Sequence, residues 1–133
     1  MKWDDSFSVG VQEIDSQHKK LVEMLGSLIS EMKKGQGRIV IGKTIEEMMN
    51  YAKVHFATEE KYMTLYNYPN STSHKKEHEK FIESAKNFYE NYMKGNLTAV
   101  ELMNFLRNWL LEHILDSDKN LGKFVCEVSL CKQ

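Results

Sequence analysis

The chain has 133 residues, of which 18 are basic and 19 acidic, so the formal net charge is −1. This length suits one domain with a real core, and the balanced charge argues against nonspecific binding of nucleic acid. The sequence has no secretory signal and no run of the roughly 20 apolar residues that cross a bilayer, so we expect a soluble, cytoplasmic protein that does not enter a membrane. One proline, seven glycines and almost no strand-forming runs predict an all-α fold.

The N-terminal part divides into an arm and a first helix. Residues 1–16 contain apolar side chains without a sustained helical spacing, which predicts an extended arm. From His18 onward, Leu21 and Leu25 continue a repeat of three and four residues. This pattern predicts a helix over about 17–34, which the following glycine-containing run ends.

Two further helices are predicted in the middle of the chain. One covers about 42–65 and ends before Pro69, because proline is poorly tolerated inside a helix. The next covers about 72–93 and ends at Gly95. Both place apolar residues at helical spacing on one face, as a bundle core requires.

The last helix is marked by its first residues. Thr98 and Glu101 have the spacing of a capping box, which predicts a helix over about 98–117. A short tail over 121–133 follows, whose apolar residues are compatible with a short terminal turn or helix. Four helices with short connections favour an up-down-up-down antiparallel four-helix bundle, here as a single domain over 1–133.

All five histidines lie where they can face the inside of such a bundle. His55 and Glu59 are four residues apart, as are His74 and His78, so each pair projects from one face of its helix. The remaining two are His18 in the first helix and His113 in the last. Burying these groups among apolar residues would cost several kcal/mol unless each found a partner, and a shared metal centre would supply the partners.

The number and kind of these groups limit the metal. Five imidazoles with carboxylates exceed what one tetrahedral zinc binds and suit two octahedral ions, and iron fits them, although manganese and zinc remain open. Ferritin-like di-iron bundles use Glu-x-x-His pairs, and no histidine here has a glutamate three residues before it. A histidine-rich centre favours reversible ligand binding over oxidation chemistry. Cys126 and Cys131 are expected to be thiols in a reducing cytosol, with a local disulfide or metal pair as the alternative.

The sequence resembles the hemerythrin family over nearly its whole length, and more closely its single-domain bacterial form. The residues that carry this resemblance are Trp3, Val9-Gly10-Val11, Ile14-Asp15-Ser16-Gln17-His18, His55-Phe56-Ala57-Thr58-Glu59-Glu60, His74-Lys75-Lys76-Glu77-His78, and the stretch from Trp109 to Asp118. The spacing of seven metal-binding side chains over four segments is highly specific.

The resemblance implies a ligand set and an activity. It implies two iron ions, one held by His74, His78 and His113 and the other by His18 and His55. Glu59 and Asp118 would bridge them, together with an oxo or hydroxo group. It further implies that the iron with two histidines keeps an open position for reversible binding of dioxygen, for storage, delivery or sensing.

Other readings of the same centre stay open. The chain is expected not to be an enzyme. Two alternatives would use the same residues. One is a di-iron enzyme acting on peroxide or nitric oxide, and the other is an oxygen or redox sensor module. A monomer is favoured. Large apolar groups next to the ligands are expected to surround the open iron and keep it dry, namely Trp109, Phe56, Leu110 and Ile114.

The last carboxylate presents a geometric difficulty. Asp118 lies five residues after His113, which is about 140° around a regular helix, whereas Asp116 lies nearer the same face. We choose Asp118 because the resemblance implies it. The hypothesis that follows is that the last helix widens or ends between His113 and Asp118.

Overall fold

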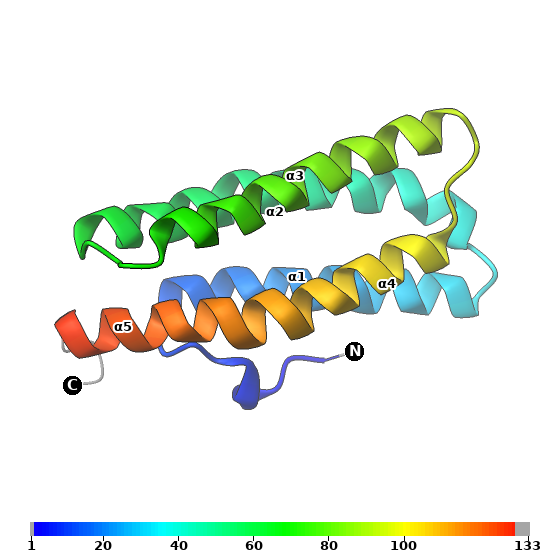
Figure 1. Ribbon diagram of the computed structural model, residues 1–133. Helices are drawn as coiled ribbons and strands as arrows, with labels where there is room; N and C mark the ends of the chain where they lie inside the picture. Colours follow the sequence, from blue (N-terminus) through cyan, green and yellow to red (C-terminus); the bar gives the residue numbers. More distant parts are fainter. Residues whose placement is uncertain (1, 130–133) are drawn as a thin grey trace.

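The computed structural model describes residues 2–129 and shows four long helical stretches side by side, with successive stretches running in opposite directions (Figure 1). The last stretch is continuous through three elements, of which the middle one is π-helical. The all-α, up-down-up-down bundle predicted from the sequence is confirmed. In chain order the elements are η1 (Asp5–Phe7), α1 (Gln12–Lys33), α2 (Gly37–Leu65), α3 (Ser71–Met93), α4 (Ala99–Trp109), the π-helical η2 (Leu110–Asp118) and α5 (Lys119–Ser129).

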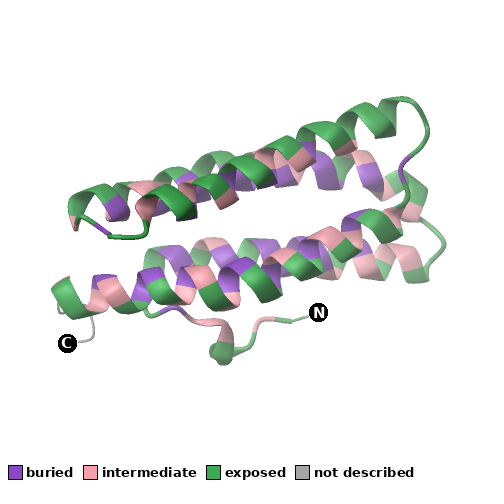
Figure 2. Cartoon of the chain, in the orientation of Figure 1, coloured by how far each residue is buried: buried purple, intermediate pink, exposed green. Residues whose placement is uncertain are grey.

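The buried residues form two apolar clusters. Helix α1 packs against α2 and α4, and α2 also packs against α3, so the buried faces of all four stretches meet inside (Figure 2). The larger cluster fills the middle of the bundle and the end where α3 passes to α4. A smaller one joins the arm to α2 and α5, and its buried members are Val9, Val11, Ile14, Met63, Tyr68, Leu121 and Val125.

The helix ends follow local sequence rules. Gly35 and Gly95 directly follow the caps of α1 and α3 and have φ of 77° and 74°, in the left-handed region that glycine adopts readily. At the start of α4, the hydroxyl of Thr98 accepts from the backbone N–H of Glu101, and the carboxylate of Glu101 accepts from the backbone N–H of Thr98. This is the capping box that the sequence predicts.

Two predicted helix starts are wrong. The sequence predicts an arm over 1–16, yet α1 begins at Gln12, because the fully buried Ile14 extends the buried face by one turn before His18. Helix α2 begins at Gly37 rather than near residue 42. Its buried face starts at Ile41, which is one turn before Ile45.

The predicted end of the fourth helix, near residue 117, is also wrong. Within the described residues, η2 and α5 continue it to Ser129, so the predicted tail is helical up to that point. Gly122 lies inside α5, where a Cβ atom would overlap the carbonyl oxygen of Val9. The missing side chain therefore lets the arm pack directly on α5. Residues 130–133 of the predicted tail lie outside the described part of the chain.

Cys126 is disulfide-bonded, so the thiol expected from the sequence is wrong for this residue. Its Sγ atom lies 3.3 Å from the carbonyl oxygen of Gly10 in the arm. The expectation depended on an assumed reducing compartment rather than on geometry. Cys131 lies outside the described residues.

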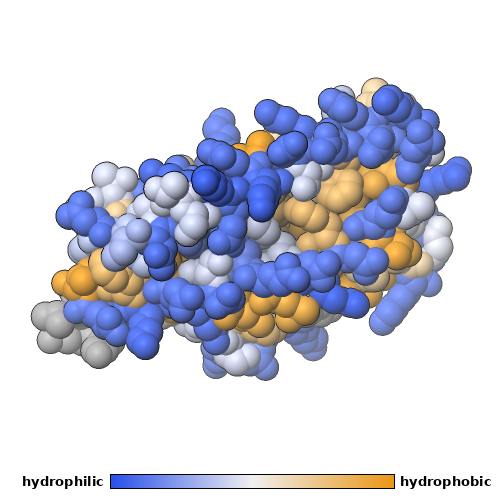
Figure 3. All heavy atoms as spheres, in the orientation of Figure 1, coloured by the Kyte–Doolittle hydropathy of each residue, from blue (hydrophilic) through white to orange (hydrophobic). Residues whose placement is uncertain are grey.

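Polar and charged residues cover much of the visible face, and apolar side chains show between the helices toward the end where α3 passes to α4 (Figure 3). Among residues 2–129, no helix is long and apolar enough to cross a membrane.

Candidate metal centre

The fold brings together all seven residues singled out in the sequence. They come from all four helical stretches, and each is at most 2% exposed. Their ligand atoms form two overlapping groups, and within each group these atoms all lie within 4.8 Å of one another. Glu59 and Asp118 belong to both groups. The first group adds His74, His78 and His113, and the second adds His18 and His55.

The π-helical segment η2 explains how the last carboxylate reaches this cluster. A π-helix bonds each residue to the fifth residue along the chain, so side chains five apart share a face. His113 and Asp118 both lie in η2 and are buried, whereas Asp116 is exposed. The helix therefore widens where the sequence hypothesis required it.

All five imidazoles point the Nε2 atom inward. The Nε2 atom of His113 lies 2.9 Å from Oδ1 of Asp118, and that of His18 lies 2.8 Å from Oδ2. On the other carboxylate, Oε1 of Glu59 lies 2.9 Å from Nε2 of His78 and 3.5 Å from that of His55. Two carboxylates thus stand between the two sets of histidines.

Several buried polar atoms of the cluster lack a hydrogen-bond partner. They include Oε2 of Glu59 and Nδ1 of His18. Leaving such atoms unpaired costs free energy, whereas nitrogen and carboxylate oxygen together are the ligands that iron, manganese or zinc accept. The residues present therefore fit a metal centre, and the shared carboxylates fit a pair of ions.

The outer nitrogens of three histidines are held by side chains that the sequence reading missed. The Nδ1 atom of His113 donates to Glu77 at 2.7 Å, and that of His78 donates to Glu60 at 3.1 Å. The Nδ1 atom of His55 donates to the amide oxygen of Gln17 at 2.6 Å. Each bond leaves the Nε2 lone pair directed into the cluster and fixes the ring.

Neighbouring side chains fix these partners in turn. Ser117 donates to the same oxygen of Glu77 at 2.7 Å, and the amide nitrogen of Gln17 donates to Thr58 at 2.9 Å. The second bond orients the amide so that its oxygen faces His55. Gln17 and His55 are 38 residues apart, so no spacing in the sequence points to this pair.

The aromatic residues expected around the open iron lie elsewhere. Phe56 stacks on His78 with ring centroids 3.9 Å apart, and Trp109 stacks on His113 at the same distance. Both rings therefore cover the group with three histidines. Leu110 and Ile114 of η2 are buried, with 1% and 0% exposure.

Tyr51 is a further residue that the sequence reading missed. Its ring lies 4.9 Å from that of His55 and nearly parallel to it, and its hydroxyl accepts from Nε1 of Trp109 at 3.2 Å. The buried stripe of α2 includes Tyr51, which precedes His55 by one turn, so helical spacing could have identified it.

The charges of the cluster shift its pKa values strongly. Burial alone would lower the pKa of His113, but the charge of Asp118 and hydrogen bonds to it outweigh burial and raise that pKa to about 11. The pKa of His74 rises to about 9, because hydrogen bonds to Asp118 and Glu59 likewise outweigh burial. Burial would raise the pKa of Asp118, yet the charge on His113 holds it well below its ordinary value. Without metal, protons on His74 and His113 balance the two carboxylates.

We predict that metal-free protein loses stability as the pH rises. His74 and His113 have folded pKa values above the ordinary value of 6.5, so their contribution is complete below pH 6.5 and is lost as the pH rises through about 9 and about 11. Each of the two groups should lower the free energy of unfolding by roughly 3 kcal/mol from pH 6.5 to 9, or roughly 6 kcal/mol together. Urea unfolding at both pH values measures this. Metal-loaded protein is the control and should change little, since bound imidazoles are already deprotonated. An unchanged stability of the metal-free protein would contradict the prediction.

Comparisons with known proteins agree with this site. The profile described as the hemerythrin HHE cation binding domain matches residues 9–125. The chain is 37% identical over 116 residues to a bacteriohemerythrin of Pseudomonas paraeruginosa, covering 87% of this chain and 75% of that protein. A bacteriohemerythrin of Stenotrophomonas maltophilia is 34% identical over 117 residues, covering 88% and 76%. A crystal structure of wild-type hemerythrin superposes with a TM-score of 0.82 at 29% identity, covering 94% of this chain and 97% of that one.

Proposed function

Because the chain belongs to the hemerythrin family, we propose that it holds two iron ions at the seven-residue cluster and binds dioxygen reversibly, for oxygen storage, delivery or sensing. The observation that carries this proposal is the pair of overlapping ligand groups that share Glu59 and Asp118. A single-ion site would not need two carboxylates placed between separate sets of imidazoles.

The two groups supply different numbers of nitrogen ligands. His74, His78 and His113 would hold one iron, and His18 and His55 would hold the other, with Glu59 and Asp118 bridging. An ion with fewer protein ligands keeps room for an external one, as open metal sites do. The iron pair, when reduced, supplies the electrons for reversible binding of dioxygen. We therefore place the external ligand on the side of His18 and His55.

The protein's own contribution is to position the ligands and exclude water. Glu60 and Glu77 orient two imidazoles of one group, and Gln17 orients His55 of the other. Leu110 and Ile114 are buried on η2, close in the chain to His113. A dry apolar surround slows loss of the bound ligand as a charged product, because little water is present to supply protons.

Shortening Leu110 should admit water and speed irreversible oxidation of the reduced protein in air. We expect Leu110→Ala to raise the autoxidation rate by roughly tenfold, since opening the apolar shell changes solvent access and dielectric at the metal. The decay of the oxygenated absorption spectrum with time measures the rate. Leu111→Ala is the matched control, because Leu111 is 53% exposed. Equal rates for the two variants would show that Leu110 does not shield the site.

Oxygen uptake tests the proposed function itself. Reduced, iron-loaded protein is titrated with dioxygen in a sealed electrode cell and then flushed with argon. A binding protein should take up about one dioxygen per pair of irons and release it unchanged. Continuous consumption of peroxide or nitric oxide with an added reductant would instead support a di-iron enzyme.

The cytoplasmic location expected from the sequence stays a prediction.

A further inference from the structure

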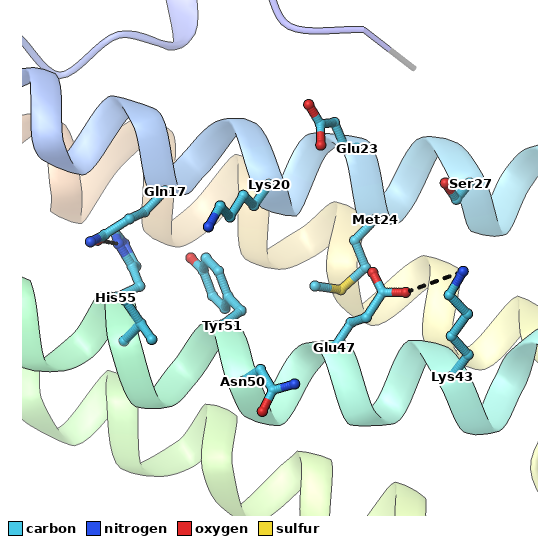
Figure 4. A pocket seen from close by; sticks show the side chains of 11 residues that line it. Gln17, Lys20, Glu23, Met24, Ser27, Lys43, Glu47, Asn50, Tyr51 and His55 are labelled. Atoms are coloured by element: carbon cyan, nitrogen blue, oxygen red, sulfur yellow. Dashed lines mark hydrogen bonds and ion pairs between the residues drawn. The ribbon is translucent and has the colours of Figure 1, made fainter.

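A groove between α1 and α2 leads from the surface toward the cluster. It has a volume of about 450 Å³, and Figure 4 shows its lining. His55 and Tyr51 lie at one end of it, together with Gln17. No other prominent groove over residues 2–129 is lined by a residue of the cluster. The groove therefore meets the cluster on the side of His18 and His55.

The lining of the groove suits a small neutral ligand. Its charges balance, since the lining includes two lysines, Lys20 and Lys43, and two glutamates, Glu23 and Glu47. The Nζ atom of Lys43 lies 4.0 Å from Oε1 of Glu47. Such a lining carries no net charge to attract an anion. Met24 points along the groove toward Tyr51, so its inner part offers apolar surface (Figure 4).

Tyr51 closes the inner end of the groove. It is 7% exposed, and its ring lies against His55, which is fully buried. Its hydroxyl is held by the single bond from Trp109 at 3.2 Å. The ring also contacts those of Phe56 and Phe81, with centroids 5.8 Å and 5.7 Å apart, so the inner end opens only when the Tyr51 side chain rotates away from these neighbours.

We propose that dioxygen reaches the His18 and His55 side of the cluster through the α1–α2 groove, with Tyr51 as the inner gate. The proposal rests on the proposed function, because it names the path by which that function's ligand arrives. It assigns Tyr51 and Val54 to ligand access and not to metal binding. A gate on the path by which a ligand both enters and leaves changes association and dissociation by the same factor and leaves affinity unchanged.

The path can be tested without iron. Dissolved dioxygen is paramagnetic and speeds the relaxation of methyl groups that it visits, and zinc-loaded protein stays diamagnetic and does not bind it. The methyl groups of Met24 and Met48 form a matched pair. Both side chains are buried, with 5% and 0% exposure, but only Met24 lines the groove. Under dioxygen pressure, the methyl group of Met24 should relax at least about fivefold more than that of Met48. Equal enhancement of both methyl groups would overturn the proposal.

Filling the groove should remove that difference. Val54 lines the groove and is 56% exposed, so Val54→Trp can fill the space without disturbing the core. Lys86→Trp is the matched control in the separate groove between α2 and α3. Lys20→Trp fills the α1–α2 groove from its other wall and replaces Val54→Trp if circular dichroism shows that variant unfolded. Loss of the Met24 enhancement in the filled variants alone is the expected result, and its persistence would contradict the proposal.

Iron-loaded protein gives a second readout. By stopped flow, Val54→Trp should slow association and dissociation of dioxygen alike, by about fivefold, while Lys86→Trp changes neither. Tyr51→Phe, which loses the bond from Trp109, should speed both rates. Unchanged rates in Val54→Trp would contradict the proposed path. A protein that binds no dioxygen with iron but shows the Met24 effect with zinc would contradict the proposed function and leave the path supported.

Discussion

Replacing Asp118 with asparagine is expected to empty the cluster of iron, whereas replacing Asp116 in the same way should leave it full. Asp118 is fully buried and lies within 3.0 Å of His18, His74 and His113. Asparagine has nearly the same shape as aspartate. It lacks the negative charge, and it lacks one of the two oxygens with which Asp118 would bridge the two ions. We expect iron to fall from about two per chain to less than about one, because loss of even an outer-shell partner costs 10–100-fold in affinity.

The comparison with Asp116 makes this a test of helix geometry. Asp116 is exposed, three residues after His113, where a regular helix would bring it near the same face. Iron is counted by mass spectrometry after anaerobic loading and gel filtration. Iron loss in Asp116→Asn, or full iron in Asp118→Asn, would contradict the ligand set and the role of the π-helical η2.

Removing the metal should lower the melting temperature by about 10–20 °C. The cluster buries five imidazoles and two carboxylates, and some of their atoms have no hydrogen-bond partner in the described structure. A ligand present at a thousandfold excess over its dissociation constant stabilises the folded state by about 4 kcal/mol, and a domain of this size gains a few degrees per kcal/mol. Calorimetry of the loaded protein, before and after a chelator, measures the change.

The Asp118→Asn variant is the control for the chelator. If it holds little iron, the chelator should change its melting temperature little, and the variant should melt close to chelated wild-type protein. If the chelator leaves the melting temperature of the wild-type protein unchanged, metal does not stabilise this fold. Equal large shifts in both proteins would show that the chelator acts elsewhere.

The sequence predicts the bundle well because its signals are local. Helical stripes, the capping box at Thr98, and the glycines at Gly35 and Gly95 each act within one or two turns. The start of α1 and the length of the last stretch are predicted less well, because both depend on contacts between distant parts of the chain. Ile14 of α1 is buried in one cluster with Leu121 and Val125 of α5, and Gly122 of α5 admits the backbone of Val9.

The site, like the fold, has features that the sequence predicts and features that it does not. The seven cluster residues are recognisable from their types and spacing, and the structure brings them together. The hydrogen bonds from His113 to Glu77 and from His55 to Gln17 join different helices, so they depend on how each helix is rotated in the bundle. Helical spacing fixes the face of a residue but not its partner across the core.

The placement of Phe56 shows the limit of arguing from sequence neighbours. It follows His55 directly, yet adjacent residues in a helix point about 100° apart. Its ring consequently covers His78 of the other group, and Tyr51, one turn earlier, is the aromatic residue that lies against His55. The residue that faces a ligand is therefore found one turn away and not next to it.

The central claim is a pair of irons that binds dioxygen reversibly, and one optical experiment tests it most directly. Anaerobically reduced, iron-loaded protein is scanned before and after air is admitted and again after oxygen is removed, with iron counted per chain. We predict about two irons per chain, as the two ligand groups require, and a visible absorption band that appears with air and disappears with its removal. One metal ion or none per chain, or oxidation in air without a reversible band, would contradict the claim.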